Sequence, residues 1–358
     1  MEKRFLFWND KDIYDIKMRQ IVLDSLKYPE CKMWMVSTLD NFLSEYNVDR
    51  TIEALRSQQF YVNAVVRRDE HGKLWGKLPE WRKMIAACHE LDIKTLYFDF
   101  GYFDHYGNFM FDTYDSNGDS SIKIEWDSMP DTLDWNTAPD EIQKYRNKFL
   151  KILDKAKQEK PINNLKSGEY VVIWPQYSMD LLRPEFREGL NPKTEVTDWV
   201  NRICEMVLDS GLTPVVKGGP AMPQWSRLNV NDIKHAPVYV HMEKQVEELP
   251  VAKYERDANH KLIAHAKYHV VSCSSVTNEL TLAGAPVIAM GQSWFTGLDI
   301  FNEPKSWDEL LKNPMYINQK NRNKWVNWWF TKQAPKDMAV KKLLEIYDKY
   351  PVLKVPQT

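Results

Sequence analysis

Several features that mark specialised classes of protein are missing from this sequence of 358 residues. No apolar stretch approaches the roughly 20 residues of a membrane-spanning helix, and the apolar run within the N-terminal MEKRFLFWND is too short for a signal peptide. The formal net charge of −2 gives the whole molecule no attraction for polyanions, so affinity for nucleic acid would need a local patch. We therefore expect a soluble, cytoplasmic protein without a membrane span.

Cysteine is scarce as well. The four cysteines, Cys31, Cys88, Cys204 and Cys273, are far apart and follow no spacing typical of metal ligands or of a disulfide framework. This pattern suits a reducing compartment, and no other motif demands a metal. The hydrophobic fraction of 43% is that of a folded globular protein, and the chain is long enough for two domains.

Two series of alternating strands and helices fill most of the chain. Candidate strands lie at residues 4–9, 32–37, 60–66 and 94–101 in the first series, and at 170–175, 213–219, 237–242, 269–274 and 285–291 in the second. Amphipathic helices are predicted at 139–158 and 194–211, the latter with Trp199, Ile203 and Val207 on one side. This alternation predicts an α/β fold with mostly parallel sheets and helical crossovers.

The segments between these elements suggest the domain boundaries. The acidic stretch 113–140, rich in Asp, Ser and Asn, is typical of a long surface insertion, and residues 159–169 are typical of a linker. We interpret residues 1–160 and 168–332 as two Rossmann-like domains that face a cleft. Residues 333–358 would then form a C-terminal helix that packs back on the N-terminal domain.

One short segment carries the main functional signal. VVSCSSVTNELTLAGAPVIAMG, residues 270–291, predicts a buried strand, a polar turn, a helix and a second strand. Ligands of such sheets lie beyond the carboxyl ends of the strands, where Ser274 and Ser275 could hold a phosphate and Glu279 could accept hydrogen bonds from a ribose. Alternatively, Ser275 caps the helix and Glu279 is a solvated acid of its first turn.

This segment resembles the strand, Ser-Ser, helix, Glu and Gly-x-Pro-Val element of the capsular polysaccharide synthesis and export family, the Kdo-transferase-like glycosyltransferases of GT-B fold. SWFTGLDIFNEPKSWDELLKNP, residues 293–314, is similar to the segment that follows this element in the family. YVVIWPQYSMD, residues 170–180, resembles the family's strand ending in Pro-x-Gln, and LYFDFGYFDHYGNF, residues 96–109, resembles its acidic-x-Gly-aromatic motif. The four blocks occur in the order of the family.

The resemblance implies a GT-B glycosyltransferase whose C-terminal domain binds a nucleotide-sugar donor. Ser274 and Ser275 would then hold the phosphate and Glu279 the ribose. Asp99 would be the general base for the acceptor hydroxyl, with His105 as a second candidate and Tyr102 on the acceptor side. The aromatic neighbours of Asp99 favour this role, although Asp99 could also cap a loop and His105 could be structural.

The sequence departs from the family at one place. Where the family has Lys-Pro-His-Pro, this chain has VVKGGPAMP, residues 215–223, so that Lys217 remains and the histidine is lost. The departure argues against a CMP-Kdo donor and favours a UDP-sugar, whose diphosphate Lys217 and the backbone at Gly219 could bind. As in the family, we expect no metal and no tightly bound cofactor.

Basic and aromatic residues are mixed near the C-terminus. Residues 312–342 contain eight lysines or arginines against one acid, with Trp325, Trp328, Trp329 and Phe330 among them. If exposed, Lys320, Arg322 and Lys324 could follow a phosphate backbone while the rings stack on bases. Alternatively, the aromatic residues are the packed face of a helix and the lysines are merely solvated.

These observations leave three classes of function open. An exposed patch favours a bacteriophage-type enzyme of the host cytoplasm that adds sugar to hydroxymethylated pyrimidines in DNA, flipping the base out of the duplex. The family resemblance favours a capsule or lipopolysaccharide-type glycosyltransferase with a glycan acceptor. A sugar-nucleotide epimerase or a non-catalytic relative on the same scaffold is the third class.

Overall fold

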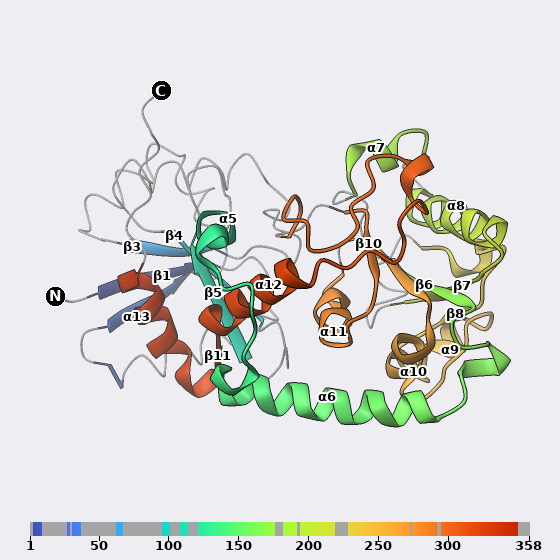
Figure 1. The fold of residues 1–358 in the computed structure, drawn as a ribbon. Helices are drawn as coiled ribbons and strands as arrows, with labels where there is room; N and C mark the ends of the chain where they lie inside the picture. The colour runs from blue at the N-terminus through green and yellow to red at the C-terminus, as the bar shows by residue number, and fades with distance from the viewer. Residues whose placement is uncertain are drawn as a thin grey trace. The chain divides into compact units, whose positions relative to one another are not determined.

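The computed structural model describes residues 3–8, 27–28, 31–36, 62–66, 95–100, 108–113, 121–175, 182–191, 194–218, 228–272, 274–291 and 295–349. The chain divides into two compact units, each built on its own β-sheet (Figure 1). Unit 1 comprises residues 1–130, 134–142 and 326–358, and unit 2 comprises residues 131–133 and 143–325. The divisions near residues 142 and 325 fall inside helices α6 (Asp140–Gln158) and α12 (Gln319–Lys332).

The sheet of unit 1 has the strand order β11-β5-β4-β3-β1-β2. Its strands are β1 (Lys3–Trp8), β2 (Cys31–Val36), β3 (Val62–Val66), β4 (Thr95–Phe100), β5 (Asn108–Thr113) and β11 (Gln333–Pro335). β1 to β4 are parallel, whereas β5 runs antiparallel to both β4 and β11. The four strands predicted for this half of the chain are therefore present, and two antiparallel strands were missed.

The prediction of a surface insertion at residues 113–140 is wrong for residues 121–125, whereas residues 126–137 are exposed or half-buried, as predicted. Residues 121–137 form α5 (Ser121–Glu125) and two short 3-10 helices, η1 (Trp126–Ser128) and η2 (Trp135–Thr137). Ile122 is fully buried, and Ser121 and Glu125 are buried with it. The polar composition misled because the buried Ser and Glu side chains have partners: Ser121 bonds to the buried Asp112 of β5, and Glu125 pairs with a lysine of α12.

The end of the chain returns to unit 1. After η7 (Lys336–Met338), α13 (Ala339–Lys349) packs against β5 and β11 (Figure 1). Its buried residues Val340, Leu343 and Ile346 recur at the spacing of one helix face. The C-terminal helix expected to fold back is confirmed.

Unit 2 contains a fully parallel sheet of order β10-β9-β6-β7-β8. Its strands are β6 (Tyr170–Trp174), β7 (Thr213–Lys217), β8 (Val238–Tyr239), β9 (Tyr268–Val271) and β10 (Val287–Ala289). The other helices that the structure describes in this unit are η3 (Ile162–Asn164), α7 (Pro184–Arg187), α8 (Glu195–Asp209), η5 (Val230–Asp232), α9 (Gln245–Glu248), α10 (Ala258–His265), α11 (Val276–Leu282) and η6 (Trp307–Glu309). All five strands predicted for this half are present.

The two faces of this sheet differ in character. On one face, the buried side of α8, with Trp199, Ile203 and Val207, packs in one hydrophobic core with strand residues such as Val171. On the other face, the register pairs Val172 with both His269 and Val215. Because side chains alternate along strands, Trp174 and Lys217 share this second face with His269. The predicted α/β fold class, with two Rossmann-like sheets, is confirmed.

Candidate functional site

The carboxyl edge of the sheet in unit 2 brings together most of the residues predicted to bind the donor. Both β7 and β9 neighbour β6, and the chain moves from one side of β6 to the other between β8 and β9. Such a reversal of strand order opens a crevice at the carboxyl ends of the strands in doubly wound sheets. Lys217 ends β7, and Ser274 and Ser275 lie between β9 and α11.

The two serines have different roles in this turn. The Ser274 carbonyl accepts hydrogen bonds from the amide (3.1 Å) and hydroxyl (2.9 Å) of Thr277, and its Oγ accepts a long bond of 3.4 Å from the Val276 amide. Ser275 occupies the N-cap position of α11, yet its side chain caps no backbone amide of that helix. Its hydroxyl is half-buried and is not committed to holding the helix, so the capping interpretation of Ser275 is wrong.

Lys217 is a buried cation beside a carboxylate. Its side chain is 3% exposed and donates a hydrogen bond of 2.7 Å to the carbonyl of Gly218. Burial lowers the pKa of Lys217 to about 8, while the nearby negative charge of Glu279 acts to raise it. In the described part of the chain Glu279 acts on Lys217 through its charge alone, and the hydrogen bond of Lys217 goes to the Gly218 carbonyl. The buried ammonium group thus lies at the carboxyl end of β7 with a carbonyl oxygen as its hydrogen-bond acceptor.

Two residues near this pair were missed in the sequence. The hydroxyl of Tyr145, on α6, donates a hydrogen bond of 3.0 Å to Oε1 of Glu279. His241 lies just beyond β8, and burial followed by the charge of Lys217 lowers its pKa. A separation of 134 positions between Tyr145 and Glu279 leaves no local signal, whereas His241 could have been noticed because it lies at the carboxyl end of the strand predicted at residues 237–242.

The residues predicted for the acceptor side are only partly described. Asp99 lies at the carboxyl end of β4, where its backbone is in register with Met110 of β5. This is the strand-end position that the sequence predicted for it. Tyr102, His105 and Gly219 lie outside the described residues, so their predicted roles stay predictions.

The basic and aromatic stretch is a packed helix rather than an exposed surface. Lys320 is exposed and Lys324 is half-buried, but Arg322 is only 1% exposed. The aromatic residues Trp325, Trp328 and Trp329 are buried as well. The expectation that Arg322 faces an acceptor on the surface is therefore wrong, because the residue packs into the interior, with its guanidinium over the ring of Phe301.

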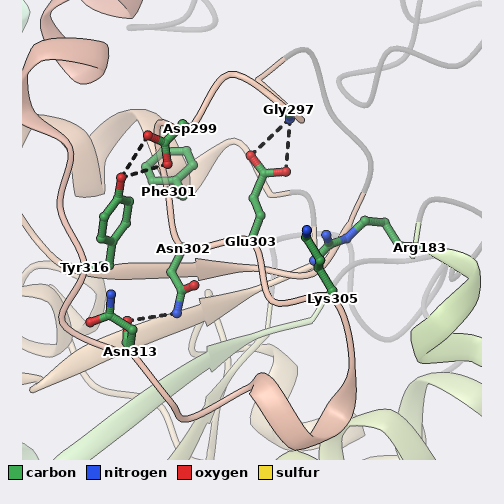
Figure 2. Close-up of a pocket in the computed structure, with 9 residues that line it drawn as sticks. All are labelled: Arg183, Gly297, Asp299, Phe301, Asn302, Glu303, Lys305, Asn313 and Tyr316. Atoms are coloured by element: carbon green, nitrogen blue, oxygen red, sulfur yellow. Dashed lines mark hydrogen bonds between the residues drawn. The ribbon is translucent and has the colours of Figure 1, made fainter.

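A separate pocket of about 470 Å³ opens in unit 2. Figure 2 shows its polar groups paired with one another: the Glu303 carboxylate accepts from the amide of Gly297, and the Asp299 carboxylate accepts from the hydroxyl of Tyr316. Arg183 donates to the carbonyls of Ala289 and Pro304. None of the residues predicted from the sequence lines this pocket, and its hydrogen bonds hold the segment after β10 in place.

Among the described residues, no group of three or more His, Cys, Asp or Glu side chains is arranged to hold a metal ion. The helices in the same part of the chain include none that is long and apolar enough to cross a membrane.

No protein-family model and no curated protein sequence matches the chain. Two solved structures of KpsC from Thermosulfurimonas dismutans are similar to it. The β-Kdo 2,7 transferase has 11% identity and a TM-score of 0.48 over 98% of this chain and 100% of that one. The β-Kdo 2,4 transferase has 12% identity and a TM-score of 0.45 over 89% of each. UDP-N-acetylglucosamine 2-epimerase from Rickettsia bellii has 10% identity and a TM-score of 0.39 over 98% and 97%. Similarity at this level assigns no activity.

Proposed function

We propose that the protein is a glycosyltransferase that moves a sugar from a nucleotide-sugar donor to a hydroxyl acceptor. The observation that carries the proposal is the grouping of Lys217, Ser275 and Glu279 at the carboxyl edge of one parallel sheet. A buried ammonium, an uncommitted hydroxyl and a carboxylate with one oxygen already hydrogen-bonded offer the three kinds of contact that a nucleoside diphosphate needs.

Each group has a distinct task in this proposal. Lys217 opposes the negative charge that develops on the departing diphosphate, and the Ser275 hydroxyl donates to a phosphate oxygen. Glu279 accepts hydrogen bonds from the two hydroxyls of the ribose through the oxygen that Tyr145 leaves open. A diphosphate carries more charge than the single phosphate of a CMP-sugar, so the buried cation favours a UDP-sugar as donor.

The transfer step requires one further group. The acceptor oxygen forms the new bond to the sugar carbon, the bond from that carbon to the diphosphate oxygen breaks, and the acceptor proton passes to a base. Asp99 is the residue we propose as that base, because position 99 is near the carboxyl end of β4 and α/β sheets bind ligands at the carboxyl ends of their strands.

A glycan is favoured over DNA as the acceptor. A protein surface that binds DNA needs exposed cations for the phosphates and exposed aromatic rings for the bases. Helix α12 does not offer them, because Arg322 and the tryptophans of this helix are buried. Exposed Lys320 and half-buried Lys324 alone make a weak electrostatic surface. A capsule or lipopolysaccharide-type glycosyltransferase is therefore the form of the proposal that the described residues support best.

The test is a thermal-shift panel with UDP, CMP, GDP and their sugars. We expect UDP or a UDP-sugar to raise the melting temperature of the wild type, and Glu279→Gln to reduce the rise. Glu243→Gln is a matched control, because Glu243 is an exposed glutamate of the same unit. Asp99→Asn should keep the shift and lose transfer. Equal shifts in wild type and Glu279→Gln would refute the donor site, and conversion of the UDP-sugar without an acceptor would assign an epimerase instead.

A further inference from the structure

Arg322 is a buried cation with unused hydrogen-bond donors. It lies in the first turn of α12, its Nε donates a long bond of 3.4 Å to the carbonyl of Ile300, and its guanidinium carbon lies 5.3 Å from the centre of the Phe301 ring. Within the residues that the structure describes, neither Nη1 nor Nη2 has a hydrogen-bond partner. Burial lowers the pKa of Arg322 to about 10, so the side chain still carries its charge at neutral pH.

His269 supplies a second unused donor. The residue is fully buried on β9, and its Nδ1 accepts a hydrogen bond of 3.2 Å from Nε1 of Trp174. Since Nδ1 accepts, the proton of the neutral ring is on Nε2, for which the described part of the chain offers no acceptor. Burial and the charge of Arg322 lower the pKa of His269 to about 3, so the ring remains neutral.

The backbone places these two side chains in the same part of unit 2. His269 is in register with Val287 on the neighbouring strand β10, and the carbonyl of Val287 accepts a hydrogen bond of 3.1 Å from the amide of Asn302. Two residues before Asn302, the carbonyl of Ile300 receives Nε of Arg322. Neighbouring strands lie about 4.8 Å apart. Between His269 on β9 and the Ile300 carbonyl that accepts from Arg322 there are therefore only β10 and the segment bonded to β10. The charge of Arg322 acts to lower the pKa of His269, which agrees with this placement.

The chemistry of the cluster specifies its occupant. A buried guanidinium with unpaired nitrogens is strongly unfavourable, and the face of the Phe301 ring offsets only part of that cost. Water could accept from the Nη groups without neutralising the charge. An oxyanion does both, because two of its oxygens match the guanidinium fork and another lone pair can accept from the Nε2 proton of His269.

We propose that Arg322 and His269 form a buried binding site for one small oxyanion of the carboxylate or phosphate class, separate from the nucleotide site. The site neutralises Arg322 in the interior of unit 2 and thereby stabilises the folded chain. Nothing in this proposal depends on sugar transfer, because the site contains neither Lys217 nor Glu279.

The test measures the melting temperature of the full chain after exhaustive dialysis. Acetate and inorganic phosphate are titrated at constant ionic strength, with gluconate as a carboxylate too bulky for a closed site and UDP as a separate arm. We expect acetate or phosphate to raise the melting temperature of the wild type by about 3 °C at saturation relative to gluconate. Arg322→Met should abolish this rise. Arg202→Met is the matched control, because Arg202 also stacks on an aromatic ring, Trp307 of the same unit, and should keep the rise.

A direct measurement of acetate and phosphate binding to the wild type tests the proposal even if Arg322→Met does not fold. Equilibrium dialysis with radiolabelled acetate and phosphate should show one saturable site per chain for at least one of the two. Absence of such a site, a rise that persists in Arg322→Met, or an effect of this substitution on the UDP arm alone would each overturn the proposal. Because UDP is titrated separately, loss of nucleotide binding and loss of the oxyanion site give different results.

Discussion

The hydroxyl of Tyr145 donates a hydrogen bond of 3.0 Å to Oε1 of Glu279. The bond joins α6, which precedes the sheet of unit 2 in sequence, to α11, which follows strand β9. The bond holds the carboxylate in one orientation and occupies one of its oxygens. The negative charge of Glu279 also acts to raise the pKa of buried Lys217. Tyr145 is therefore a positioning residue for the carboxylate that we propose to bind ribose.

Tyr145→Phe should weaken nucleotide binding without unfolding the chain. The ring of Tyr145 stacks on Phe149 with centroids 6.5 Å apart, and phenylalanine keeps this contact. Loss of one hydrogen bond to a charged group costs about 1.5 kcal/mol, so UDP should bind about tenfold more weakly by calorimetry. Tyr254→Phe, at an exposed tyrosine of the same unit, should leave the affinity unchanged. Equal affinities for wild type and Tyr145→Phe would show that the bond is structural only.

Ser275→Ala separates capping from ligand binding. Removing a capping serine normally costs about 1 kcal/mol of stability, but the Ser275 side chain makes no capping bond. We therefore expect a free energy of unfolding within about 0.5 kcal/mol of the wild type, together with an affinity for UDP reduced several-fold. Denaturant unfolding and calorimetry measure the two quantities. A clear loss of stability with unchanged affinity would reverse the assignment.

Lys217→Met should raise stability while it abolishes tight nucleotide binding. The pKa of Lys217 is about 8 in the folded chain, below the ordinary lysine value of 10.5. Between these pH values the unfolded chain binds more protons, so this residue makes wild-type stability increase with pH, by at most about 3 kcal/mol. The variant lacks that increase, and its advantage over the wild type should be largest below pH 8 and vanish near pH 10.5.

Unfolding curves at pH 7.5 and pH 10 check the stability change. Lys244→Met, at an exposed lysine of unit 2, is the control and should show no such dependence on pH. Calorimetry provides the functional half of the test: affinity of the wild type for UDP should fall as pH rises through 8, because Lys217 then loses its charge. A pH-independent affinity would remove Lys217 from the proposed site.

The strands could be predicted because buried parallel strands are continuous apolar runs. Residues Tyr170–Trp174 of β6 are all buried, and the sequence YVVIW shows this directly. Arg322 could not be placed in the same way. Arginine is rarely buried, and the contacts that Arg322 makes in the interior are with Ile300 and Phe301, about 20 positions earlier.

Most features that could not be predicted from the sequence are contacts between residues far apart along the chain. The strand β11 has only three residues, and its partner β5 lies more than 200 positions earlier. Tyr145 and Glu279 show the same limit within unit 2. Pattern within a segment predicts which face of an element is buried, whereas the identity of a distant polar partner depends on how the elements pack.

Lys332 should be the most sensitive of the lysines that the structure describes in unit 1. It is fully buried at the end of α12, where its Nζ lies 3.0 Å from Glu125 and 3.4 Å from Asp112. Burial lowers the pKa of Lys332 and the two carboxylates act to raise it. Lys332→Met leaves both acids without this cation, so we expect a loss of about 3–5 kcal/mol in the free energy of unfolding.

Denaturant unfolding should place this loss far above that of Lys341→Met, a substitution at an exposed lysine of the neighbouring helix α13. The double variant Lys332→Met with Glu125→Gln removes the cation together with one of its two anions. Its loss should be smaller than the sum of the two single losses by more than about 1 kcal/mol, because the uncompensated charge that each single variant creates is partly removed. Strict additivity would mean that the two side chains are not coupled, and that the burial of Lys332 is tolerated for some other reason than its pairing with Glu125.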